Sequence, residues 1–234
     1  MVKRNSSIIT ETTKLLKDIT GLLTKEQLQD FKENISIQNF KKSEVIYQQG
    51  DVPQMCHCLM SGKVKVYKDG VGGKTQIIRV IKPVEYFGYR AYFAGQNYVT
   101  SASAFESTTI CLIPLDLIEK WMKENIDLAM YFIKTLAIEL GNSDQRTVSL
   151  TQKHIRGRLA ESLLFLQDCY GLEQDGATLS IYLSREDLAN MSNMTTSNAI
   201  RTLSAFANEK IIAIDGKKIK IIDNKELERI SEAG

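Results

Sequence analysis

Hydrophobic and polar positions change their spacing twice along the chain. Between residues 35 and 113, short runs rich in β-branched and aromatic residues alternate with glycines or polar turns, and residues 44–47, 63–67 and 75–81 are clear examples. Short strands that follow one another at regular spacing are typical of sandwiches and barrels, so this stretch predicts an all-β domain. Just before it, a capping-box pattern from Thr24 to Gln27 predicts a short helix over residues 25–34.

Beyond Pro114 the apolar positions fall at helical spacing instead. From Ile126 this pattern continues for about 28 residues without proline, which corresponds to a helix of roughly 40 Å. Intervals of four and three alternate within it, as along the seam of a coiled coil, so the helix is predicted to pair with a second copy of the chain. The alternative is a long core helix within one chain. The predicted dimer interface comprises Ala129, Ile133, Leu136, Leu140, Ser143, Thr147 and Leu150, while Tyr131, Phe132 and Ile138 are expected to face the β domain.

The helical pattern restarts after the seam. A further helix is predicted from Ile155 to about Tyr170, and Gly157 within it indicates a hinge between domains. A polar loop follows, and then a short strand is expected near residues 179–183.

Two short helices are predicted next. Ser184 begins the first as its N-cap, Asn193 suits a sharp turn with a left-handed backbone, and Thr195 caps the second helix. Together they predict a helix-turn-helix. The apolar side of the second helix is expected to hold Ala199, Ile200, Leu203 and Phe206.

The first turn of this second helix is rich in small hydrogen-bonding side chains. Thr196, Ser197 and Asn198 are mediocre helix formers, but short donors can approach base edges and phosphates when a helix enters the major groove with its N-terminus first. Arg201 follows one turn later and can pair with O6 and N7 of a guanine. This helix is therefore predicted to bind double-stranded DNA.

A β-hairpin is predicted directly after the helix-turn-helix. Asp215-Gly216 is a strong two-residue turn signal, and Lys217, Lys218 and Lys220 make the hairpin locally basic. This arrangement predicts a wing that meets phosphates. The competing interpretation is that the helix start and the hairpin are ordinary solvated surface on a domain that binds another protein.

Composition limits the classes of protein that fit. The chain has 234 residues, of which 43% are hydrophobic and 25% charged, which is typical of a soluble globular protein with one or two domains. No apolar run is long enough for a membrane span or a secretory signal, so a cytoplasmic protein with reduced cysteines is expected. Residues 151–234 contain eleven Lys and Arg against twelve Asp and Glu, so the DNA-binding prediction depends on local placement of charge.

Three other chemistries fit the sequence less well. The glycine-rich stretch from Gly70 to Thr75 lacks the first glycine of a phosphate-binding loop, and strand patterns flank it on both sides, so a hairpin turn is expected there. Alternation along a strand places Cys56 and Cys58 on one face and His57 on the other, so no metal site is predicted. No pattern of nucleophile, base or paired carboxylates indicates an enzyme.

The order of these elements resembles the Crp/Fnr family of bacterial transcription regulators, which are related to the cyclic-AMP receptor protein. The most specific segments are residues 155–166 and 184–206, and Gly50-Asp51, Ser61-Gly62 and Phe87-Gly88 match glycines of the family's β-roll. The resemblance implies an α+β fold with an N-terminal jelly-roll sensor, similar to cyclic-nucleotide-binding domains, over residues 1–126. A dimerisation helix would cover 127–154, and a winged helix-turn-helix 155–234.

The resemblance also implies roles for single residues. Phosphates would be held by Thr195, Asn198 and Ser184. Arg201 matches an arginine that reads bases in the family. At Thr196 and Ser197 the family often has an Arg-Glu pair instead. The departure at Thr196 and Ser197 predicts a different operator sequence, because a short hydroxyl cannot reproduce a bidentate arginine contact. The complete predicted set of DNA-binding residues is Ser184, Arg185, Thr195, Thr196, Ser197, Asn198, Arg201, Lys217 and Lys218.

The chain departs further from the family in the effector pocket. In relatives that bind cyclic nucleotides, a glutamate follows Phe-Gly and an Arg-Ser pair comes about ten residues later; here Tyr89 replaces the acid, and Tyr98 and Val99 replace the pair. A phosphate buried without its cation is costly, so cyclic AMP is not the expected ligand. A different, unidentified effector is expected, or a filled pocket. The predicted pocket residues are Gly88, Tyr89, Arg90, Tyr98, Val99, Ser143 and Asp144.

The sequence therefore predicts a homodimeric, sequence-specific DNA-binding transcription regulator in the cytoplasm, with RNA polymerase as a further partner. Some members of the family bind haem, for which His57, His154 or a methionine would supply the axial ligand. The alternative function is a ligand-sensing protein, responding to haem or redox state, or a scaffolding protein whose C-terminal domain binds protein rather than DNA.

Overall fold

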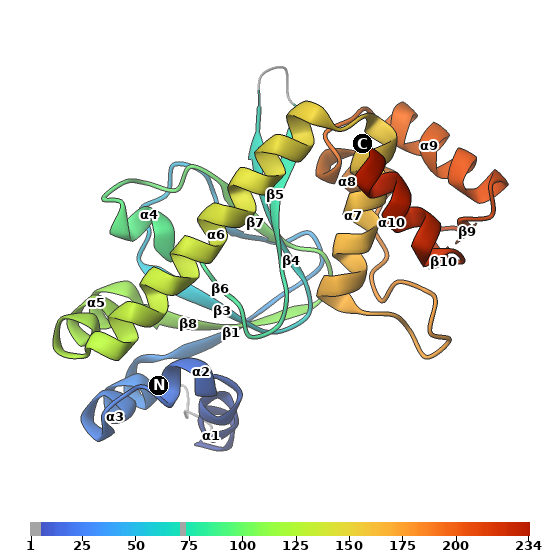
Figure 1. Cartoon of the computed structure of the whole chain (residues 1–234). Coiled ribbons are helices and arrows are strands. Elements are labelled where there is room, and N and C mark those ends of the chain that lie inside the picture. Colours follow the sequence, from blue (N-terminus) through green and yellow to red (C-terminus); the bar gives the residue numbers. More distant parts are fainter. Residues whose placement is uncertain (1–5, 71–73) are drawn as a thin grey trace. The chain divides into compact units, whose positions relative to one another are not determined.

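The computed structural model describes residues 6–70 and 74–234, which form two compact units. The first unit contains the chain up to Lys68 and from Arg79 to Leu140, and the second contains residues 69–78 and 141–234. In chain order (Figure 1), the elements up to the end of the β domain are α1 (Ser6–Leu15), α2 (Lys17–Thr20), α3 (Lys25–Asn34), β1 (Ser36–Phe40), β2 (Val45–Tyr47), β3 (Met55–Ser61), β4 (Val64–Asp69), β5 (Thr75–Ile81), β6 (Tyr86–Phe87), α4 (Tyr89–Phe93), β7 (Ser101–Ala104) and β8 (Thr108–Pro114).

The remaining elements are helical except for one hairpin. They are α5 (Leu115–Glu124), α6 (Ile126–Gln152), α7 (Ile155–Tyr170), α8 (Arg185–Met191), α9 (Thr196–Asn208), β9 (Ile212–Asp215), β10 (Lys218–Ile221) and α10 (Asn224–Ala233).

The β domain consists of two four-stranded sheets with the strand orders β1-β8-β3-β6 and β2-β7-β4-β5. Their inward-facing side chains form one buried cluster, the roll core, to which every one of these strands contributes. The predicted β-roll is thereby confirmed, and residues 75–81 form β5 as expected. The roll core comprises Phe40, Tyr47, Leu59, Val64, Val66, Ile81, Phe87, Ala91, Tyr98, Ala102, Ala104 and Ile110.

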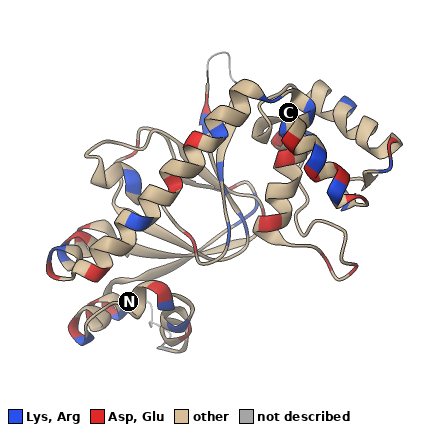
Figure 2. Ribbon diagram, viewed as in Figure 1, with Lys and Arg blue, Asp and Glu red and all other residues tan. Residues whose placement is uncertain are grey.

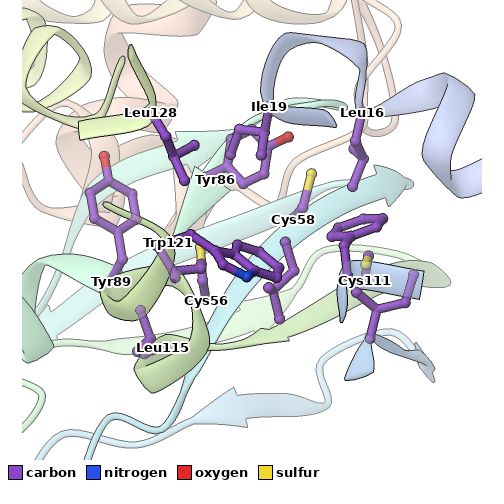
Figure 3. Close-up of a cluster of buried hydrophobic side chains, with 14 of the residues drawn as sticks. Leu16, Ile19, Cys56, Cys58, Tyr86, Tyr89, Cys111, Leu115, Trp121 and Leu128 are labelled. Carbon is purple, nitrogen blue, oxygen red and sulfur yellow. The ribbon is translucent and has the colours of Figure 1, made fainter. Parts of the chain in front are cut away.

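A second buried cluster, which we call the helical cluster, covers the outer face of the β3-containing sheet, where helices pack on it (Figure 3). Cys56 and Cys58 of β3 point into this cluster together with Cys111 of β8, whereas His57 lies on the opposite face, so the predicted alternation is confirmed. Cys56, Cys58 and Cys111 are buried free thiols, and burial raises the pKa of Cys111 to about 12. Since the thiolate is the reactive form, these three buried thiols serve packing.

Local sequence signals position the helices around the roll. Thr24 and Gln27 form the predicted capping box, and α3 has the predicted bounds. The helical pattern after Pro114 is interrupted at Asn125, whose side chain accepts a hydrogen bond from the Leu128 amide and so begins α6. The amide of Gly70 donates to the carbonyl of Lys74 at 2.8 Å, as in a hairpin, although residues 71–73 of that predicted turn lie outside the described residues.

The first half of α6 lies against the helical cluster. Phe132 is buried there and Tyr131 packs at its edge, as predicted. Ile138 is 55% exposed, so its expected contact with the β domain was wrong: Glu139, the next residue, faces the roll instead. Within the part of the chain that the structure describes, no helix combines the length and the hydropathy needed to cross a membrane.

The second unit is built on α7, which packs against α8, α9 and α10. Gly157 lies inside α7, where a Cβ would come within 2.6 Å of the carbonyl carbon of Gly234, so this glycine permits close packing rather than acting as the predicted hinge. The break between helices falls at Lys153 and His154 instead. The strand expected near residues 179–183 is also wrong, because this segment makes only an isolated bridge at Leu179.

Candidate nucleic-acid interface and roll interior

The turn between α8 and α9 has the local chemistry expected of a helix-turn-helix. The hydroxyl oxygen of Ser184 accepts a hydrogen bond from the amide of Asp187 at 3.0 Å, which caps α8. Asn193 has φ = 49°, the left-handed conformation that reverses the chain. α9 then begins with Thr195 as its N-cap, whose hydroxyl oxygen accepts from the amide of Asn198 at 3.2 Å. These predicted features are confirmed.

One side of α9 is exposed along its whole length. We call this side the reading face; it comprises Thr196, Ser197, Ile200, Arg201 and Ser204, which recur at helical spacing. The opposite side buries Ala199, Thr202, Leu203 and Phe206. Ile200 was expected on the buried side and is 47% exposed instead, because it lies one residue, about 100°, away from the row that begins at Ala199.

Arg201 is held toward the N-terminal end of the reading face. Its Nη2 donates to Oδ1 of Asn198 at 3.2 Å, and its Nε donates to the carbonyl of Ser197 at 3.4 Å. Figure 2 shows that the α9 ribbon is almost free of charged residues, so this guanidinium is set among hydroxyl and apolar groups. A lone oriented guanidinium on a polar helix face suits a guanine edge.

The wing is the hairpin of β9 and β10. Lys218 pairs with Asp215 in the register, so the two-residue loop is Gly216-Lys217, one position later than the Asp-Gly turn expected from the sequence. Lys217 and Lys218 are exposed, and Nζ of Lys218 lies 5.5 Å from the ring centroid of Tyr182. Nη2 of Arg185 donates to the carbonyl of Gly216 at 2.7 Å, so this arginine links the start of α8 to the wing loop.

Two arginines that the sequence did not single out hold the helix-turn-helix in place. The guanidinium of Arg158 donates to the carbonyls of Ser192 and Asn193 in the turn, and also to those of Leu150 near the end of α6 and Lys153 just after it. Such convergence on backbone carbonyls gives no periodic signal in a sequence.

Arg146 of α6 behaves in the same way. It donates to the carbonyls of Ile77 and Ile78 in β5 and, at 3.1 Å, to that of Met191 at the end of α8. Burial lowers the pKa of this guanidinium. Because five-donor guanidinium groups can bridge several backbone segments at once, these two residues join segments that all lie within the second unit.

Two of the predicted pocket residues, Gly88 and Tyr98, lie among aromatic rings in the roll interior. Inside the roll, the rings of Tyr47 and Tyr98 stack with centroids 3.9 Å apart, and the ring of His57 stacks on that of Phe87 with centroids 5.0 Å apart. We call these four residues the aromatic cluster. Gly88 adjoins the cluster with φ = +84°, and a Cβ there would lie 2.6 Å from Nδ1 of His57. Burial lowers the pKa of His57 to about 4 and raises that of Tyr47 to about 12.

A short polar chain extends from this region to α6. The hydroxyl of Tyr89 donates to Oε1 of Glu139 at 3.1 Å, and Nη1 of Arg79 lies 2.8 Å from Oε2 of the same carboxylate. Tyr89 is buried, and both burial and the nearby Glu139 charge raise its pKa. Tyr89, which by the resemblance stands where cyclic-nucleotide-binding relatives carry a glutamate, is therefore already bonded within the chain.

The other predicted pocket residues are not enclosed in the same way. Arg90 is exposed and Val99 half-buried in the first unit, while Ser143 and Asp144 are exposed on α6 in the second unit. His154, the second histidine, is the exposed N-cap residue of α7, and its amide donates to the carbonyl of Gly234. Within residues 6–70 and 74–234, no group of three or more His, Cys, Asp or Glu side chains is placed to hold a metal ion.

The predicted seam of α6 is only partly exposed. Ile133 and Leu140 are 54% and 64% exposed, whereas Leu136 packs against the helical cluster of its own chain and Ala129 is half-buried. Ser143 and Thr147 are exposed and Leu150 is half-buried. Met130 lies beside Ile133 on the exposed side.

A β-roll, a long helix and a winged helix-turn-helix define a class of DNA-binding transcription regulators. The model of the cyclic nucleotide-binding domain matches residues 37–125, and that of the Crp-like helix-turn-helix domain matches residues 157–230. The chain belongs to the Crp/Fnr family and is a sequence-specific transcription regulator.

Relatives cover most of the chain at low identity. It is 22% identical over 192 residues to a CRP-like cAMP-activated global transcriptional regulator from Mycobacterium tuberculosis. The aligned part covers 82% of this chain and 86% of the relative. It is 24% identical to a global nitrogen regulator from Nostoc, with 79% and 84% covered. FixK2 from Bradyrhizobium japonicum has a similar fold, with a TM-score of 0.76 at 21% identity over 84% of this chain and 96% of that one.

Proposed function

We propose that this regulator binds DNA as a homodimer, that the reading face of α9 enters the major groove, and that the wing contacts phosphates. The predicted division into a sensor over residues 1–126, a dimerisation helix over 127–154 and a DNA-binding domain over 155–234 belongs to this proposal. It acts in the cytoplasm together with RNA polymerase and carries out no catalysis.

The exposed reading face carries this proposal. A helix whose first turns present Thr196, Ser197 and an oriented Arg201, and whose opposite side is fully packed, has the form needed to meet base edges. Thr195 can still donate its hydroxyl proton to a phosphate while capping the helix. Ser184 and Asn198 lie at helix starts, where backbone amides favour anions.

Selection from a random duplex pool, followed by a salt titration of the selected operator, tests DNA binding. Phosphate contacts predict that the logarithm of the binding constant falls steeply and linearly with the logarithm of salt concentration. A protein that binds only another protein through this domain would select no sequence and would show no such slope.

The exposed side of α6 supports the homodimer. Met130, Ile133 and Leu140 form an apolar stripe that a monomer would leave in water, and a second α6 in parallel would cover it. We expect Leu140→Glu to convert a dimer to a monomer in sedimentation and to abolish operator binding, because two half-sites can no longer be held at one helical repeat. Val52→Glu, at an exposed position of the β domain, is the matched control and should stay dimeric.

The roll interior supports a regulator that does not bind cyclic AMP. The stacked Tyr47 and Tyr98 lie in the roll interior, and Tyr89 and Arg79 are engaged by Glu139. We expect calorimetric titration with cyclic AMP to give no binding heat, and operator binding to need no added nucleotide. Stoichiometric binding of cyclic AMP would show that the aromatic cluster opens, and this part of the proposal would be wrong.

A further inference from the structure

Ile200 is an unusual residue for the reading face. It is 47% exposed, while the aliphatic and aromatic side chains of α9 at Leu203 and Phe206 are buried. Its neighbours on the exposed side are hydroxyls and one guanidinium. A large β-branched side chain in the middle of this polar face does not belong to the buried row of α9, which begins at Ala199.

The surroundings of Ile200 give it a defined direction. Thr196 lies one turn before it, so the methyl group of Thr196 and the side chain of Ile200 lie on the same strip of the helix surface. Arg201 follows directly and is drawn toward the N-terminal end of the helix by Asn198 and Ser197. An apolar strip therefore runs beside the base-reading guanidinium.

The major groove offers one apolar group to such a strip. Each base pair presents hydrogen-bond donors and acceptors there, and only thymine adds a methyl group, at C5. An isoleucine can make no hydrogen bond to a base edge, but it can cover that methyl and remove it from water.

We propose that Ile200 is a specificity-determining residue that contacts the 5-methyl group of a thymine next to the guanine read by Arg201. This inference rests on the proposed function of the reading face and deepens it. Each operator half-site then contains a guanine and an adjacent pyrimidine that must carry a methyl group. The aliphatic contact supplies part of the sequence preference that the hydroxyls of Thr196 and Ser197 cannot supply.

The test replaces thymine by deoxyuridine, which removes only the methyl group. With the operator selected by the wild-type protein, each thymine is changed singly in one half-site and the dissociation constant is measured by fluorescence anisotropy. One position should show a loss of about fourfold in affinity, as expected for one buried methyl group. Cytosine at that position should bind weakly, and 5-methylcytosine should recover part of the loss.

Variants assign the effect to a residue. Ile200→Ala should bind the thymine operator about fourfold more weakly for each half-site and should no longer distinguish thymine from deoxyuridine. Thr196→Ser is the matched control: it removes one methyl group from the same strip and should keep the deoxyuridine effect. Because Ile200 is exposed, thermal unfolding of Ile200→Ala should match the wild type, so a binding change is not a folding change.

The outcomes separate the two proposals. If a sequence is selected but no thymine position responds to deoxyuridine, or if Ile200→Ala keeps the full response, the role of Ile200 is overturned while the DNA-binding function stands. The same holds if Thr196→Ser rather than Ile200→Ala abolishes the response. If no duplex is selected at any salt concentration, the proposed function itself fails, and the role of Ile200 fails with it.

Discussion

The reading face of α9 and the interior of the β-roll differ in what replaces the family's charged residues. In the roll, Tyr89, Tyr98 and Val99 stand where acid, arginine and serine are expected, and the two tyrosines have partners within the chain. On α9, Thr196 and Ser197 are exposed, and by the resemblance they stand where the family often has an Arg-Glu pair. A buried site that loses its charges is closed by packing, whereas an exposed site stays open to a partner.

The largest effect is expected inside the roll. Tyr98→Ala removes one ring of the stacked pair and should lower the free energy of unfolding by about 3–5 kcal/mol, the usual range for deleting a buried aromatic side chain. Tyr98→Phe keeps the ring and should stay within about 1 kcal/mol of the wild type. Chemical denaturation measures both. A loss below about 1 kcal/mol for Tyr98→Ala would indicate a loosely filled pocket, and the contrast between the two regions would disappear.

The next effect concerns the open face. Arg201→Ala should weaken binding to the selected operator by roughly 5- to 150-fold for each half-site, while binding to unrelated DNA changes little, because a bidentate guanine contact reads sequence. Arg229→Ala is a suitable control, since Arg229 is exposed on α10 and bonds to Glu226. Competition assays with specific and scrambled duplexes give the ratio. An unchanged specificity ratio for Arg201→Ala would show that another residue reads the operator.

Local sequence signals were sufficient to predict the elements that carry the reading face. Caps at Thr24, Ser184 and Thr195 and the turn at Asn193 depend on neighbouring residues only, and the structure has all of them. The β-roll and the long α6 followed from periodicity in the same way. Assignments to DNA contact, effector pocket and dimer interface stay predictions, because they concern partners outside the chain.

The errors came from packing between distant segments. The local sequence predicts a hinge at Gly157 because it does not show the close approach of this glycine to Gly234. Ile200 was placed in the core because isoleucine is apolar, although Thr202 takes the buried position. The aromatic cluster joins residues from four separate segments, so no spacing rule could reveal that these rings pack together inside the roll.

A smaller effect sharpens the comparison through pH. His57 is buried in its neutral form, and burial lowers its pKa from 6.5 to about 4. Between pH 6.5 and pH 4 the unfolded chain therefore binds a proton at this residue that the folded chain does not bind. As a result, the free energy of unfolding falls as the pH falls from 6.5. By pH 5 this residue should cost about 2 kcal/mol of unfolding free energy. His57→Phe should lose that part of the pH dependence, whereas His154→Phe, at the chain's other histidine, should keep it. Parallel pH profiles for wild type and His57→Phe would mean that His57 titrates freely and the cluster is open to water.

The smallest effect concerns the wing, where charge rather than base contact is expected to act. Lys217 is exposed in the two-residue loop that Arg185 holds through the carbonyl of Gly216. Lys217→Ala should therefore weaken binding to all duplexes alike by a few-fold and should reduce the slope of log K against log salt by about one for each wing. Lys225→Ala, at the start of α10, is the matched loss of a lysine and should leave the slope unchanged. Because a phosphate contact carries no sequence information, a change in the specificity ratio of Lys217→Ala would place this lysine at a base edge and extend the reading surface beyond α9.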